Sequence, residues 1–439
     1  ALRATAEKGS KAVPYNLSNS TGAADVENTA NCYVVNAPGT YSFPLVYGNA
    51  INNGQVNYAA YTSKASIQGT LNPFINHLGN GITDPYIAKN TDCVPVKAEL
   101  VWQDAPSLVT DIKYNSGTNG GTISFKVDKE NIRQGNALIA IKDSQNTILW
   151  SWHIWITDEN IYHTIKVTNH QNVSHDLMPI HLGWCEGEVI NYAARSCQVQ
   201  FIAHGQTRLI TVNQMRSTTS TQGNCTFYEW GRKDPLRPSS GYAYKNKTWY
   251  NAAGIASTAN HAVESFPFGN ECIKNYIRKP DVMQKEIGGD NTYFNLWNAD
   301  NNTNSNVYND NPVTKTVYDP CPVGFAMPPS NTFTGFTTTG ENVTNTVAKY
   351  NGEWNSSLPG WNFYCGPNKT GGTIFFPMTG ERISSGGHLS AVGSLGHTWS
   401  ATSTHSNYAH NLTLYTNYWV WPLDRFSKSA GHGVRPCLE

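Results

Sequence analysis

The chain of 439 residues balances 31 Lys and Arg residues against 31 Asp and Glu residues, so its formal net charge is zero. A neutral chain has no overall attraction to polyanions, which disfavours nucleic acid and anionic membranes as partners. The 13 Trp and 23 Tyr residues, with only 14% charged residues, are typical of exported β-proteins with polar loops. No run of about 18 apolar residues occurs, so we expect no transmembrane segment.

The N-terminal third alternates short strand patterns with turn residues. Residues 1–30 are polar and should be extended, and residues 31–48 predict two short strands around a Pro-Gly turn. Residues 49–95 are rich in Asn and Gly and predict a long insertion. Four further strands are predicted at residues 98–103, 108–114, 122–127 and 137–142. Two of them alternate apolar and polar residues, which favours a β-sandwich with one face of each sheet on a core.

The most hydrophobic predicted strand spans residues 148–157. Trp150 and Trp152 point to one face, whereas His153 and Trp155 point to the other. Because both faces are largely apolar, we expect the strand to be buried on both sides, at a seam between two domains. His153 is interpreted as a hydrogen-bonded core histidine.

After about residue 160 the pattern changes to long loops with aromatic residues and little helical periodicity. Residues 192–202 and 207–212 predict a hairpin around His204-Gly205. The sequence therefore predicts a mainly β protein in two parts, a β-sandwich domain at 1–160 and a second domain with long insertions at 161–439.

Nine cysteines are spread along the chain without a Cys-x-x-Cys motif, which disfavours zinc ribbons and thioredoxin-like redox sites. Their spread suits long-range disulfides in an exported protein. Cys321 and Cys437 lie in the first and last predicted strands of the C-terminal region. We expect them to form a disulfide, worth about 4–5 kcal/mol through loop closure. The alternative is two buried free thiols.

Several segments resemble one family. They are LGW at 182–184, YEWGRKDP at 228–235, NLWN at 295–298, DPCPVGF at 319–325 and GVR at 433–435. Together they look like the major-paralogous-type C-type-lectin-like domain of Bacteroides-type surface proteins, a resemblance that implies an α+β fold for residues 161–439. Residues 31–48 and 100–157 resemble the β-sandwich that accompanies this domain in fimbrial and adhesin subunits.

The resemblance implies an exported adhesin on the outer membrane, in a fimbrium. In stalk pilins of such systems, a C-terminal strand inserts into the sheet of the neighbouring pilin by donor-strand exchange. This chain stops directly after the expected last strand, so we expect a pilus-tip subunit that accepts a strand without donating one. The partners would be that neighbouring pilin and a host or bacterial surface glycan or protein. The alternatives are a stalk pilin and, because the formylglycine-generating oxidases use the same fold, an enzyme.

The candidate binding surface surrounds the last predicted hairpin, over residues 386–429. Leu412 and Leu414 should face inward, so Asn411 and Tyr415 should face outward. Aromatic rings stack on sugars and short polar side chains hydrogen-bond to them, a composition that suits a binding surface. The predicted ligand-binding residues are Tyr408, His410, Asn411, Tyr415, Asn417, Tyr418, Trp419, Trp421 and Arg425. For Trp421, and for Trp399 nearby, the alternative is a buried structural role.

No motif for chemistry accompanies this surface. The calcium-binding triplets Glu-Pro-Asn, Gln-Pro-Asp and Trp-Asn-Asp are absent, and carboxylates are scarce after Glu381. The sequence also lacks the Gly-x-Ser-x-Gly, His-Glu-x-x-His, P-loop and dinucleotide motifs. We therefore predict no catalytic residue, no metal site and no cofactor.

Overall fold

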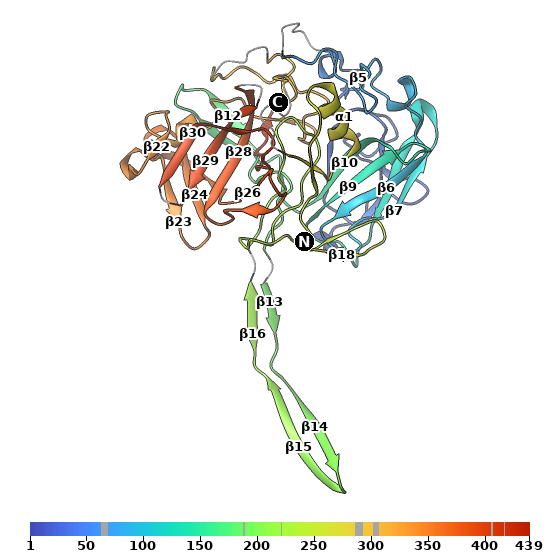
Figure 1. The fold of residues 1–439 in the computed structure, drawn as a ribbon, viewed down its shortest axis with the longest axis vertical. Helices are drawn as coiled ribbons and strands as arrows, with labels where there is room; N and C mark the ends of the chain where they lie inside the picture. Colours follow the sequence, from blue (N-terminus) through green and yellow to red (C-terminus); the bar gives the residue numbers. More distant parts are fainter. Residues whose placement is uncertain are drawn as a thin grey trace.

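The computed structural model describes residues 1–62, 69–187, 189–220, 222–285, 293–301, 307–404, 407–416 and 418–439. These residues are mainly β, as predicted, and form a rounded body from which one long two-stranded ribbon projects (Figure 1). Among them, a single α-helix is found, α1 (Asn270–Arg278). Short 3-10 helices are η1 (Leu2–Ala4), η2 (Tyr58–Ala60), η3 (Ile87–Lys89), η4 (Thr118–Gly120), η5 (Thr334–Phe336), η6 (Val347–Lys349) and η7 (Pro367–Lys369). No helix in the described part of the chain is long and apolar enough to cross a membrane.

Two sheets pack face to face in the N-terminal half. The first contains, in order, β1 (Tyr15–Asn16), β3 (Gly39–Pro44), β8 (Thr122–Val127) and β7 (Thr110–Asn115). The second contains β18 (Ala256–Ser257), β17 (Trp249–Tyr250), β6 (Lys97–Gln103), β9 (Gly135–Lys142), β10 (Ile148–Ile156) and β2 (Cys32–Val35). The Phe43 ring of the first sheet lies 5.0 Å from the Trp152 ring and 5.1 Å from the Tyr33 ring of the second. The four strands predicted between residues 98 and 142 are β6 to β9, and this two-layer arrangement is consistent with the predicted β-sandwich.

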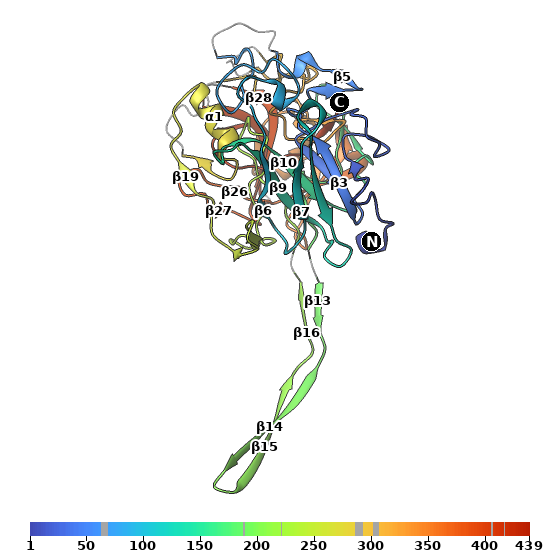
Figure 2. The same cartoon turned by 90° about the vertical axis from the view of Figure 1, so that its right-hand side faces the viewer.

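Strand β10 is buried on both faces, as its sequence predicted. It pairs with β9 on one edge and β2 on the other. Residues of the predicted second part, 161–439, contact it: the Trp155 indole donates to the Trp184 carbonyl (3.0 Å) and the Ser151 hydroxyl to Asp234 (2.7 Å). Helix α1 also packs near β10 (Figure 2). One core cluster contains buried side chains from Leu2 to Val434, so the predicted parts 1–160 and 161–439 share a core.

The C-terminal half contains a second core between two more sheets. One sheet has the order β22 (Val343–Thr344), β30 (Trp419–Ser427), β29 (Tyr408–Tyr415) and β28 (Leu395–Ser403). The other has the order β23 (Gly352–Asn355), β24 (Gly360–Gly366) and β25 (Thr370–Pro377). Stacked phenylalanines fill the space between them, with the Phe336 and Phe363 rings 4.0 Å apart. Small pairs elsewhere are β4 (Ile51–Asn52) with β5 (Gln55–Val56), β19 (Val263–Glu264) with β20 (Met283–Gln284), and β26 (Glu381–Arg382) with β27 (Leu389–Ser390).

The ends of the C-terminal region meet in one sheet, but no disulfide joins them. The sheet has the order β11 (Ile165–Thr168), β12 (Ser174–Leu177), β31 (Cys437–Leu438) and β21 (Phe325–Ala326). The register places Ala326, five residues beyond Cys321, opposite Cys437. Cys321 belongs to the large N-terminal core and Cys437 to the second core. Both are free thiols, so the predicted Cys321–Cys437 bridge is wrong and its alternative of two buried thiols is correct.

The projecting ribbon is the predicted hairpin, extended by a second pair of strands. It consists of β13 (Val189–Tyr192), β14 (Arg195–Ala203), β15 (Gln206–Gln214) and β16 (Ser217–Ser220), with β13 paired to β16 and β14 to β15. His204 and Gly205 form the turn with φ of 49° and 73°, the left-handed conformation that a tight hairpin turn requires. The ribbon points away from the body in both views (Figure 1, Figure 2).

Candidate functional site

Four aromatic residues gather on the outer face of the sheet that contains β29 and β30. Trp419 and Trp421 alternate along β30 and therefore share a face, where their rings stack 4.6 Å apart at 9°. Tyr415, opposite Trp419 in the register, brings its ring within 4.9 Å of it. Tyr418 lies beside Tyr415 and is 53% exposed, whereas the other three are half-buried. We call these four residues the aromatic strip.

The backbone pattern explains why the strip faces outward. Leu412, Leu414 and Val420 point to the opposite face and are buried in the second core. Of the adjacent residues Tyr418 and Trp419, Tyr418 is exposed and Trp419 is half-buried. The Trp421 indole donates to the Thr344 hydroxyl of β22 (3.0 Å), which fixes the orientation of its ring. The strip is thus an anchored apolar surface with polar neighbours.

The remaining predicted residues do not join the strip. Tyr408 is 41% exposed and Arg425 is also exposed, but both lie toward the other end of the β29–β30 pair. Tyr408 and Tyr415 are the first and last residues of β29, about 23 Å apart at a strand rise of about 3.3 Å per residue. Asn417 lies outside the described residues.

Two predicted ligand contacts are buried, and the expectation that they face a ligand is wrong. His410 is 2% exposed and its ring packs 4.1 Å from that of Tyr308. Asn411 is 1% exposed and donates to the Thr413 hydroxyl (2.8 Å). Alternation correctly places His410 and Asn411 on opposite faces of β29. At this end of the strand, however, other segments cover both faces. Trp399 is also buried, and its indole donates to the Tyr228 carbonyl (2.8 Å), which confirms its alternative structural role.

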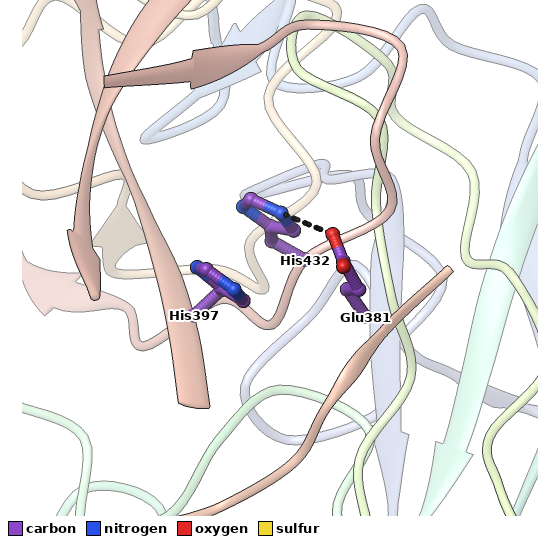
Figure 3. A group of neighbouring side chains, drawn as sticks. All are labelled: Glu381, His397 and His432. Carbon is purple, nitrogen blue, oxygen red and sulfur yellow. Dashed lines mark ion pairs between the residues drawn. The ribbon is translucent and has the colours of Figure 1, made fainter. Parts of the chain in front are cut away.

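A second cluster, which sequence reasoning missed, consists of Glu381, His397 and His432 (Figure 3). Their nearest ligand atoms lie within 4.8 Å of one another, and all three residues are buried. His432 Nε2 is 3.6 Å from a Glu381 oxygen, and Asn411 Nδ2 donates to His397 Nδ1 (3.3 Å). Because these residues are far apart in the chain and follow no ligand spacing, only the fold brings them together.

The electrostatics of this cluster keep both imidazoles neutral at pH 7. Burial, and secondarily the nearby His432, lowers the pKa of His397 to about 3. Burial also lowers the pKa of His432 well below its ordinary value. Neutral imidazole is the form that binds a metal ion.

The ring geometry nevertheless does not suit a shared ion. The two imidazoles are stacked, with centroids 4.3 Å apart and planes at 13°. An imidazole nitrogen donates its lone pair in the plane of the ring, so one ion cannot lie close to both planes. The His432 ring also stacks on Trp399 at 4.3 Å, which opposes its rotation. In this arrangement the cluster is a packed aromatic stack beside a carboxylate rather than a metal-ligand set.

The YEWGRKDP segment is buried and connects the two halves of the body. Lys233 Nζ contacts the carbonyl of Ser151 on β10 at 3.0 Å and both oxygens of Asp234 at 2.7 Å. Arg232 pairs with Glu229 and donates to carbonyls near the end of α1. This motif therefore has a structural role in the core.

A scan of protein-family models, a search of curated proteins and a search of solved structures each gave no match.

Proposed function

We propose that this protein is an exported adhesin of the cell surface, a subunit of a fimbrium at the outer membrane, which binds a glycan through the aromatic strip. The observation that carries the proposal is the strip itself: four aromatic side chains on an outer sheet face, held by a rigid pair of long strands. Aromatic faces contact the apolar faces of sugar rings over a large area, and they lose little conformational entropy on binding. The neighbouring polar side chains supply hydrogen bonds.

The architecture gives the proposal additional support. In the resembled lectin-like domain the first and last strands pair, and here β21 pairs with β31. The long middle segment between them carries the aromatic strip. The two-layer N-terminal half suits a pilin-type sandwich that accepts a donor strand from a neighbouring pilin.

The proposal is tested by glycan-array binding of the full chain and two single variants. Trp419→Ala and Tyr418→Ala should each weaken binding about tenfold or more, because central aromatic residues dominate such contacts. The control is Tyr244→Ala, which removes another exposed ring, 63% exposed against 53% for Tyr418, distant in sequence from the strip. Because Trp419 is half-buried, urea denaturation of each variant must show an intact fold. Unchanged binding by both strip variants would refute the assignment of the site.

The stalk-pilin alternative differs in where the subunit lies along a fibre. Immunogold labelling of fibres should place this protein at one end only, as expected for a tip subunit. Labelling along the shaft would favour the stalk pilin. The oxidase alternative requires copper binding, which metal analysis of the purified protein measures directly.

A further inference from the structure

The projecting arm, residues 189–220, is an unusual feature for a protein in isolation. Along β14 and β15 every described side chain is exposed, including those of large apolar residues. Phe201 is 55% exposed, and Ile210 and Val212 are each 52% exposed. A two-stranded ribbon alone is marginally stable in water, because it cannot bury an apolar face. It also leaves both of its edges open to pairing.

The register of the arm sorts its side chains onto two unlike faces. Residues directly opposite each other in an antiparallel pair share a face. One face carries the pairs Cys197–Val212, Val199–Ile210 and Phe201–Arg208 in its middle, with Arg195–Gln214 and Ala203–Gln206 at its two ends. The other face carries the pairs Ser196–Asn213 and Gln198–Thr211, with apolar residues only nearer the tip. The arm therefore has one mostly apolar face of the kind that marks a protein–protein contact.

Charge indicates which partner this face meets. The arm contains Arg195, Arg208 and Arg216 and no Asp or Glu, so its formal charge is +3. Since the whole chain has zero net charge, the rest of it carries −3. The arm and the body of this protein are therefore electrostatically complementary, whereas two arms repel each other.

We propose that two copies of this chain exchange arms, so that the apolar face of each arm packs on the body of the other copy. The estimated area favours reciprocal exchange. Strands of about 15 residues in a ribbon about 10 Å wide present about 500 Å² per face. One arm on one body buries about 1,000 Å², and two reciprocal contacts bury about 2,000 Å², which is the size of a stable interface.

Sedimentation velocity of the full chain over a range of concentrations tests the proposal. The wild-type chain should dimerise, and the double substitution Phe201→Ser with Ile210→Thr should raise the dimer dissociation constant about tenfold or more. The matched control, Gln198→Ser with Thr211→Ser, alters the polar face of the arm and should leave the constant unchanged. Since the arm makes no part of either core, these variants should retain the wild-type unfolding transition.

Two further measurements distinguish the arm contact from other associations. Cys197 lies on the apolar face, and of the nine cysteines, all of which the structure describes, it alone is exposed. Its reaction with a maleimide should therefore slow as the dimer forms. Added salt, or Arg195→Gln with Arg208→Gln, should weaken the dimer because the charge attraction is screened or removed. The proposal would be overturned if the chain stays monomeric and Cys197 reacts fast at all concentrations. It would also be overturned if the chain dimerises but the apolar-face substitutions leave the dimer dissociation constant unchanged. These readouts do not involve glycan, so they are independent of the proposed function.

Discussion

Acidification should destabilise this protein through its buried histidines, and His153 allows the size of the effect to be calculated. Its Nε2 donates to the Asn136 side-chain oxygen (2.9 Å), and its Nδ1 accepts from the Tyr228 hydroxyl (3.2 Å). The bond accepted by Nδ1 requires the neutral ring, because a protonated Nδ1 has no lone pair to accept with, and burial lowers the pKa of His153 to about 3. In the unfolded chain the pKa is about 6.5. Between about pH 6.5 and pH 3, His153 is therefore protonated in the unfolded state but not in the folded state.

The stability that His153 contributes is complete above pH 6.5 and is lost as the pH falls toward 3. Each pH unit in this window costs about 1.4 kcal/mol, so a change from about pH 6.5 to 4.5 costs about 2.7 kcal/mol. His397, with a pKa also lowered to about 3, should add a similar loss. The total is a large part of the roughly 5–15 kcal/mol that stabilises a typical domain.

Urea denaturation followed by Trp fluorescence at several pH values measures this effect. His153→Gln removes one titrating group, so the free energy of unfolding should fall less steeply with decreasing pH, by about 1.4 kcal/mol per unit. The control His163→Gln changes an exposed ring and should keep the wild-type slope. Identical slopes for wild type and His153→Gln would refute the reasoning, whatever the stability at neutral pH.

Two further predictions concern buried groups. Lys233→Met should lower the free energy of unfolding, measured by urea denaturation, by about 3–5 kcal/mol, because it leaves the Asp234 carboxylate buried without its cation. Adding Asp234→Asn to this variant should restore part of the lost stability. A further loss of stability in the double variant would contradict this reasoning. Alkylation in denaturant without reductant should add nine labels by mass spectrometry; seven labels, with Cys321 and Cys437 as the unlabelled pair in a peptide map, would show that the Cys321–Cys437 disulfide forms.

Much of the local structure could be predicted because it depends on neighbouring residues. Alternation identified β7 and β8, and the apolar character of both faces predicted the two-sided burial of β10. His204-Gly205 located the hairpin turn because few residue pairs adopt its backbone conformation. Alternation in the last strands likewise predicted the outward direction of Tyr415.

The errors arose where segments far apart in the chain meet. Alternation shows which residues share a face of β29, but it cannot show that Tyr308 covers His410. A disulfide depends on the separation and direction of two backbones, which strand patterns alone do not give for Cys321 and Cys437. The stacked His397 and His432 likewise carry no recognisable spacing in the sequence.

The interlocked first core has a consequence for how the protein is made. Asn31, which directly precedes β2, donates to the carbonyls of Val317 and Asp319. Strands β17 and β18, within residues 249–257, extend the same sheet beyond β6. Because the same core also contains Val434, a chain emerging from a ribosome or an export channel cannot finish its first core until almost all of it has appeared. In a chain that has not yet reached residue 318, Trp150 of β10 lacks the Tyr318 ring that stacks on it, and an incomplete chain would need a chaperone to keep it from aggregating. Such long-range closure also predicts slow folding.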